Sequence, residues 1–259
     1  MLARTAAGFL SNQLDTEVKI KTFYVKPDLR IHAEEVQIND RKHLPMFYVG
    51  KFDAKLSLRN ITNEYRIKDV NIDDVLFNLV KYENEYQTNL AELFGSDDEK
   101  KERKKINTKI YLDRLNLVKG HLIVWNQNKD MPHKTSMDYG YLDIDSIYLS
   151  ARNLYYNGDS IIGIMDNLSA ADRCGFTIDE FSSDSPFLVS SKGIDFKNLM
   201  IKTHATDLNL DLKFLYNGYD DYKKFVDSIM IIANIKSSQL TLSDLRYFSA
   251  KMGMMTDTL

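Results

Sequence analysis

The sequence predicts a mainly β protein, an elongated antiparallel meander whose sheet has one apolar inner face, with a short helix at each end. Three observations lead to this prediction. A short apolar pattern recurs five times, and two stretches alternate strictly between polar and apolar residues. The third is composition, because 15 Tyr and 13 Phe stand against 4 Pro in 259 residues, and aromatic rings pack well on a pleated, half-buried surface.

The recurring pattern is an apolar residue, two mostly polar residues, then two apolar residues around one spacer. The five copies begin at Ala33, Ile67, Leu112, Ile144 and Phe196. A step of two keeps side chains on one face of a strand, whereas a step of three shifts the phase by one residue. Each copy therefore predicts a β-bulge that leads into a half-buried strand. The copies start 34, 45, 32 and 52 residues apart, which is too irregular for a propeller or tight solenoid.

Residues 1–14 predict an amphipathic helix, because apolar residues recur at helical spacing from Leu2 to Leu14. The segment has one basic residue, Arg4, whereas helices that lie on membranes carry many Lys and Arg residues. We therefore expect the helix to plug one end of the sheet. Binding to a membrane surface is the alternative.

Residues 15–94 predict a first section of sheet. Its clearest strand follows Gly50, where four apolar residues face one way and the intervening polar residues, Lys51 to Arg59, face the other. Such a separation is typical of a sheet with one face in water and the other dry. Residues 65–82 predict two further strands.

Residues 95–105 carry nine charges in eleven positions, a run that cannot be buried and predicts an exposed loop. Sheet is expected to continue over 106–242, and the strand from Thr206 to Phe214 alternates as strictly as the one after Gly50. The expected strands of this section are 106–117, 120–126, 139–149, 152–157, 160–165, 174–181, 187–191, 194–202 and 206–216.

The end of the chain predicts a short helix near 219–227, a strand at 229–236 and a C-terminal helix at 243–259. Ser243 is a suitable N-cap for the last helix. No polar tail follows, so we expect the sequence to be cut from a longer chain.

Composition and charge exclude several classes of protein. The net charge of −3 offers no basic field for nucleic acid. The single cysteine, Cys174, excludes an internal disulfide. No run of eighteen apolar residues is present to span a bilayer. Arg4 interrupts what would be the apolar core of a signal peptide.

Catalytic and metal-binding patterns are weak. The five histidines are scattered, and no two have ligand spacing. Asp207, Asn209 and Asp211 resemble the start of a calcium loop, but the required glycine and glutamate are replaced by Leu212 and Gly218. No nucleotide-binding or hydrolase motif occurs. We therefore predict a protein that is not an enzyme and has no cofactor, metal or catalytic residue.

Several segments, taken in order, carry a family resemblance: Ala3–Ser11, Thr16–Ile20, Ala33–Asp40, Val75–Tyr82, Asn89–Leu93, Tyr141–Ile144, Gly175–Ile178 and Leu240–Phe248. This order resembles the N-terminal periplasmic portion of the TamB family, within the AsmA-like superfamily, in its Bacteroidetes form. Each segment is a hydrophobic pattern rather than a catalytic signature. The resemblance implies a curved, taco-like sheet with an apolar groove.

The resemblance also implies a location and partners. TamB-like proteins are anchored in the inner membrane by an N-terminal helix, cross the periplasm, and meet an Omp85-type barrel at the outer membrane. They act in phospholipid movement and in outer-membrane protein assembly. This sequence contains neither the anchor helix nor the family's C-terminal domain. It is therefore expected to be a soluble, membrane-proximal segment of a longer protein.

The expected function is to shield phospholipid acyl chains in the groove during transport between the two membranes. The alternative is a scaffold that assembles outer-membrane barrels by strand augmentation. The candidate groove residues are Phe52, Ala54, Leu56, Leu58, Val75, Phe77, Leu79, Leu208, Leu210, Leu212 and Phe214.

Overall fold

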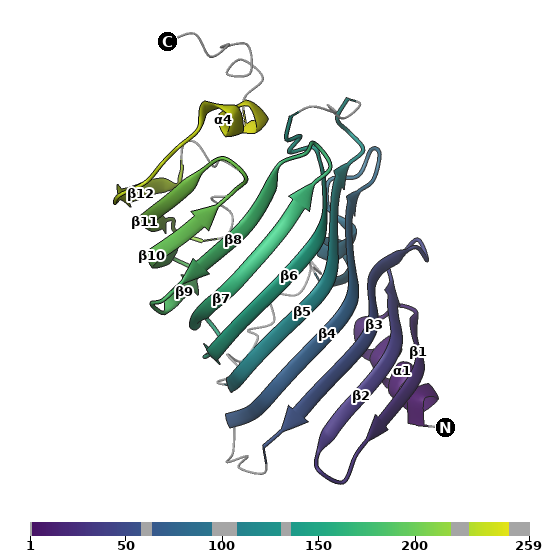
Figure 1. Ribbon diagram of the computed structural model, residues 1–259. Coiled ribbons are helices and arrows are strands. Elements are labelled where there is room, and N and C mark those ends of the chain that lie inside the picture. Colours follow the sequence, from purple (N-terminus) through teal and green to yellow (C-terminus); the bar gives the residue numbers. More distant parts are fainter. Residues whose placement is uncertain (1, 58–63, 95–107, 131–135, 219–227, 249–259) are drawn as a thin grey trace.

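The structure, a computed structural model, describes residues 2–57, 64–94, 108–130, 136–218 and 228–248. In these residues twelve strands form one sheet in the order β1-β2-β3-β4-β5-β6-β7-β8-β10-β11-β12, and β9 pairs with β7 and β10. Figure 1 shows the strands side by side in one curved layer. Neighbouring strands pair antiparallel except at one place, so the predicted mainly β, mostly antiparallel sheet is confirmed.

The elements follow the chain in a nearly unbroken series. The strands are β1 (Val18–Val25), β2 (Arg30–Asn39), β3 (Pro45–Leu56), β4 (Glu64–Lys81), β5 (Lys109–Asn126), β6 (Tyr141–Tyr156), β7 (Ile161–Asp172), β8 (Thr177–Ser183), β9 (Phe187–Ser190), β10 (Gly193–Lys202), β11 (Asp207–Leu215) and β12 (Met230–Ile235). The described helices are α1 (Leu2–Leu14), α2 (Asn89–Phe94) and α4 (Leu242–Phe248).

Three pairs of predicted strands are single long strands, so these boundaries were wrong. Residues 65–82 form β4 alone, 106–117 and 120–126 both belong to β5, and 139–149 and 152–157 both belong to β6. The supposed breaks are bulges, at which the ladder shifts register without ending. A bulge changes the phase of the alternation and bends the strand, but it keeps the neighbouring hydrogen bonds.

The prediction of an antiparallel meander fails between β4 and β5, which run parallel over 16 paired positions from Glu64↔Lys109 to Lys81↔Asn126. Parallel neighbours need a crossover connection of a dozen or more residues. Residues 82–108 supply that length and contain α2, a helix that the sequence did not predict. The predicted charged loop at 95–105 lies outside the described residues.

A first row of irregular backbone crosses the sheet from β2 to β6. Glu35, Asp74, Lys119 and Ser146 have φ values of 48°, 61°, 55° and 51°, unusual for residues other than glycine. Gly50 of β3 lies opposite Glu35 and Asp74 in this row. A Cβ atom at Gly50 would lie 2.8 Å from the Cβ of Asp74, so the close approach requires glycine.

A second row crosses from β4 to β10. Lys68 and Asp113 are left out of the ladders of β4 and β5 at the same level, and Asn153 in β6 has φ 53°. The row continues to Asn198 in β10, with φ 50°, where the ladder to β11 shifts register.

All five copies of the sequence pattern lie on one of these two rows. The ladders shift register at the Ile67, Ile144 and Phe196 copies, which confirms the predicted bulge there. At the Ala33 and Leu112 copies, Glu35 and Asp113 are left out of the ladders without a register shift. Bulges bend strands and increase their twist, which accounts for the curvature in Figure 1.

The N-terminal helix lies against the first strand of the sheet, as Figure 1 shows. The backbone N–H of Val18 donates to Ser11 Oγ at 3.0 Å, which joins the end of α1 to β1. No residue of α1 is buried, and Leu2 and Phe9 are each 63% exposed. The helix therefore covers the β1 end of the sheet only in part.

The C-terminal helix α4 packs on the ends of the later strands. The ring of Phe176 lies 4.9 Å from that of Phe248, and the backbone N–H of Met137 donates to the carbonyl of Tyr247 at 2.7 Å. The described helix spans 242–248, against a predicted 243–259, and residues 249–259 lie outside the described residues. The predicted helix at 219–227 also lies outside them.

Candidate functional site

The candidate site is the face of the sheet on which apolar residues of neighbouring strands meet. In β3 and β4, Phe52 pairs with Ile72 and Ala54 pairs with Val70. In β5, Leu115 pairs with Val70. We call this side the inner face and the opposite side the outer face.

The same face continues to the last strand. Leu208, Leu210, Leu212 and Phe214 of β11 pair with Ile201, Leu199, Phe196 and Ile194 of β10. In β12, Ile235, Ala233 and Ile231 pair with Leu210, Leu212 and Phe214. The two alternating stretches, which are more than 140 residues apart in sequence, thus belong to one apolar surface. Among described strand residues on the inner face, outside the bulges, the charged ones are Lys81 and Asp172, both at strand ends.

The outer face carries ion pairs between neighbouring strands, together with some apolar residues such as Leu76, Val80 and Ile123. Arg114 Nε lies 3.0 Å from Asp69 Oδ1, and Arg152 Nε lies 2.7 Å from Asp166 Oδ1. Such exposed pairs each contribute little free energy to stability. Burying their charges would be costly, however, so this side of the sheet stays exposed to water. Further pairs are Glu64–Lys109, Asp73–Lys119, Glu180–Lys202 and Asp195–Lys213.

No second sheet covers the inner face within the described ranges, and the helices contact the sheet mainly at β1 and β4. The predicted groove residues are accordingly of three kinds. Ala54, Val75 and Leu210 are buried, while Phe77 is 38% exposed. The half-buried ones are Phe52, Leu56, Leu79, Leu208, Leu212 and Phe214. Leu58 lies outside the described residues.

The inner face is most tightly packed near the C-terminal end of the sheet. Phe187, Phe196, Leu199 and Leu210 form a buried cluster. The Phe196 ring stacks on Phe187 at 5.4 Å and meets the edge of Phe181 at 5.2 Å. Large side chains fill the curve of the sheet here. In β2 to β4 the buried residues include the smaller Ala33, Ala54 and Val70, together with Met46 of β3.

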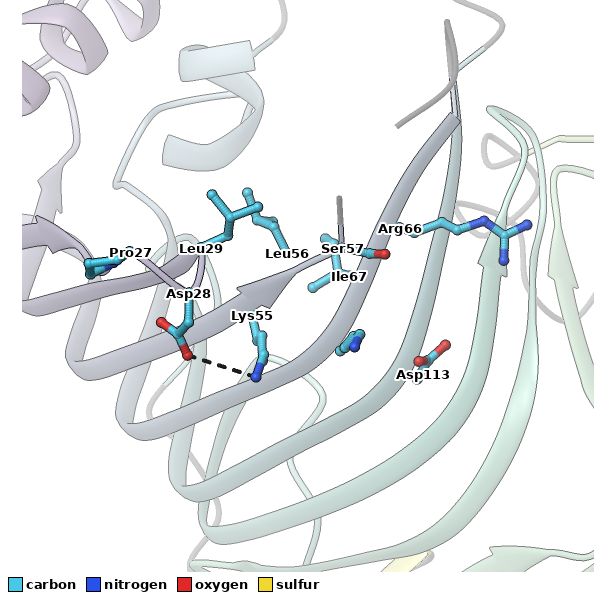
Figure 2. A pocket seen from close by; sticks show the side chains of 10 residues that line it. Pro27, Asp28, Leu29, Lys55, Leu56, Ser57, Arg66, Ile67 and Asp113 are labelled. Carbon is cyan, nitrogen blue, oxygen red and sulfur yellow. Dashed lines mark ion pairs between the residues drawn. The ribbon is translucent and has the colours of Figure 1, made fainter. Parts of the chain in front are cut away.

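A cleft of about 590 Å³ lies where β3 ends and where β2 and β4 begin (Figure 2). Figure 2 shows Leu29 and Leu56 on the inside of the curved strands and Lys55 on the outside. The Lys55 ammonium lies 3.7 Å from Asp28 Oδ2, and the Arg66 guanidinium lies 4.6 Å from the Tyr111 ring. The cleft therefore joins apolar inner-face residues to a charged rim. Its remaining charged residues are Lys68 and Asp113.

Two polar clusters that sequence reasoning missed are structural in character. His32 lies between two carboxylates, with Nδ1 3.0 Å from Asp53 Oδ1 and Nε2 3.2 Å from Glu34 Oε1. Hydrogen bonding to Asp53 and Glu34 raises the pKa of His32 above its ordinary value of 6.5. Glu34 lies two residues from His32 on the same face of β2, but Asp53 would be recognisable only from the cross-strand register, which the sequence does not reveal.

The second cluster lies beside β4 and hydrogen-bonds to backbone groups of that strand. The Asn89 side chain accepts from the Val80 N–H and donates to the Asn78 carbonyl, both at 3.0 Å, as a neighbouring strand would. Tyr82 donates to the buried carboxylate of Asp40, and burial together with this contact raises the pKa of Tyr82. No group of three or more metal-ligating side chains occurs in the described part of the chain.

Comparisons with known protein families and with curated proteins find no match for this chain. Of the described helices, α1 is the longest at 13 residues, and none is both long and apolar enough to cross a membrane.

Proposed function

We propose that this chain is a membrane-proximal segment of a TamB-like or AsmA-like protein and that its inner face shields phospholipid acyl chains. The observation that carries the proposal is a continuous apolar face, from β1 to β12, that no second described layer covers. Contact with acyl chains would remove this surface from water, which stabilises by about 25 cal/mol for each Å² of apolar area.

The arrangement suits an amphiphile with two chemically different parts. Acyl chains would lie on half-buried residues such as Phe52, Leu56 and Phe77, where space remains. A headgroup would stay at the charged rim of the cleft, near Lys55 and Arg66. The cluster around Phe187 would leave less room for a chain than the β2 to β6 part of the face.

A pair of substitutions in β4 tests the proposal. Phe77→Glu puts a carboxylate on the inner face at a position exposed enough for the charge to reach water. Asn71→Glu adds the same charge on the outer face of the same strand. Lipids extracted from each purified protein are then measured by mass spectrometry.

We expect the parent and Asn71→Glu to retain phospholipid and Phe77→Glu to lose most of it, with unchanged far-UV circular dichroism. Charge in an apolar lipid contact is unfavourable unless it is solvated or neutralised. Equal lipid in all three proteins, or none in the parent, would contradict the proposal.

The wider setting of the proposal comes from the family resemblance. Under this proposal, the full-length protein is anchored in the inner membrane, crosses the periplasm and meets an Omp85-type barrel. The alternative, a scaffold for barrel assembly, would use sheet edges instead of the inner face. Site-specific cross-linking separates the two, because a conduit cross-links to lipid from inner-face positions and a scaffold cross-links to barrel strands from edge positions.

A further inference from the structure

The last strand, β12, is the one described strand in which every residue is exposed, and it carries large apolar residues on both faces. All six of its residues are exposed, and Met230, Ile231, Ile232 and Ile235 are 62%, 50%, 46% and 61% exposed. On the outer face, where the neighbouring strand β11 carries Asp and Lys residues, β12 carries Met230 and Ile232. Strands that are apolar on both faces are typical of positions covered on both sides.

The outer edge of β12 also has unused backbone groups. Lys236 donates its N–H to the Asn209 carbonyl at 2.8 Å, so alternate residues of β12 direct their backbone groups toward β11. The groups of Ile231, Ala233 and Ile235 then point away from β11. No described strand pairs with this edge. An exposed apolar edge strand is a template for another strand.

The opposite edge of the sheet is protected. In β1, Lys19 and Lys21 are charged, and α1 packs along the strand. Lysines on an edge strand disfavour the addition of a further strand. A head-to-tail contact of β12 with β1 of the next copy, which would generate a filament, is therefore disfavoured. The described β12 contains no charge, so two copies of it can meet without like-charge repulsion.

We propose that β12 is a self-association edge that pairs antiparallel with β12 of a second copy of this chain. A twofold axis perpendicular to the sheet would place both inner faces on the same side, so one apolar surface would run through both copies. The proposal rests on the edge of β12 and is independent of what the inner face binds. Six paired residues bury less than the roughly 1,600 Å² of a standard interface, so the dimer is expected to be weak.

Sedimentation equilibrium of the full chain over a range of concentrations tests this proposal. We expect the mass to rise from that of one 30.0 kDa chain to twice that value, with a dissociation constant on the order of micromolar. Ala233→Pro removes an outward N–H without removing a bond to β11, because proline has no donor. It should raise the dissociation constant by about tenfold or more.

Ala233→Ser is the matched control, because serine keeps the N–H at nearly the same size, and it should dimerise as the parent does. Ile232→Lys adds a charge on the outer face of β12 and should also weaken the dimer, whereas Val118→Lys on the outer face of β5 should not. Unchanged far-UV circular dichroism identifies folded variants. A parent that stays monomeric, or an Ala233→Pro variant that associates as tightly as Ala233→Ser, would overturn the proposal.

Discussion

The glycine at position 50 shows how a single residue allows the sheet to bend. It lies in the first row of irregular backbone, where its Cα faces the side chain of Asp74. A side chain at this point would meet Asp74 and the carbonyl oxygen of Asp73, 2.8 Å and 3.2 Å from the added Cβ. The row therefore depends on the absence of a side chain in β3.

We predict that Gly50→Ala lowers the free energy of unfolding by roughly 1–3 kcal/mol, the usual range for overpacking. Gly8→Ala is the control, because no atom lies within 4 Å of the added Cβ and alanine favours helix. That change should stabilise the protein slightly. Urea unfolding measures both, and an equal effect of the two substitutions would show that Gly50 has no steric role.

We expect the free energy of unfolding to depend on pH because of His32. Its pKa is raised in the folded protein, mainly by the hydrogen bond to Asp53. A raised pKa means that the folded state holds the proton more tightly than the unfolded state. The stabilisation is thus fully present below pH 6.5 and is lost as pH rises through the folded pKa.

We therefore expect the parent to lose stability as the pH rises above 6.5 and through the raised pKa of His32, and His32→Gln to lose less over the same interval. An NMR titration should place the His32 pKa above 6.5, and Asp53→Asn should lower it. A His32 pKa at or below 6.5 in the parent would contradict the assignment.

At the scale of elements, the sequence pattern located irregular backbone better than it located strand ends. The step of three from Ile144 to Ile147 predicted a bulge, and the ladder shifts there. The prediction separates strands 139–149 and 152–157 at Ser150 and Ala151, although the ladder to β7 only shifts register there and β6 continues. A bulge and a turn both interrupt the alternation, and only the partner strand distinguishes them.

We expect the helix α1 to protect the edge strand β1 from association with other chains. It packs on β1 and is joined to it through Ser11. Deleting residues 2–14 should lower the melting temperature and produce assemblies larger than a dimer, because it would uncover the edge of β1. Leu2→Ser with Phe9→Ser is the control, since both residues are exposed and such surface changes usually stay within roughly 0.5 kcal/mol.

Light scattering during a thermal scan measures both properties. A deletion variant with the melting temperature and mass of the parent would show that α1 does not protect the edge. Loss of stability in the double serine variant would instead show that α1 is buried in solution by another contact.

At the scale of the whole molecule, the inner face of the sheet is apolar from β1 to β12, and the outer face carries the ion pairs between strands. Inner-face leucines and phenylalanines pair with one another from strand to strand, and outer-face charges pair in the same way. The two rows of bulges bend this layer toward its apolar side, as Figure 2 shows near Leu29 and Leu56. Curvature brings inner-face side chains closer together, which leaves them half-buried without a second layer.

The predicted groove is not uniform along the molecule. Leu210 and Phe77 were predicted as equivalent lining residues, yet Leu210 is 6% exposed inside the Phe187 cluster and Phe77 is 38% exposed. Alternation assigns a residue to a face, but the space in front of that face depends on how side chains from other strands fill it. Leu210 is accordingly a core residue, and a carboxylate there would be costly to bury.

The sequence by itself determined which residues share a face in the alternating strands and where the alternation changes phase in the five copies of the pattern. Both are local properties, because side chains alternate with a period of two and one inserted residue changes the phase. The tertiary structure alone decided the parallel pairing of β4 with β5, the alignment of bulges into two rows and the exposure of the β12 edge. Each of these depends on which distant strand becomes a neighbour, and a strand's own residues specify its partner only weakly.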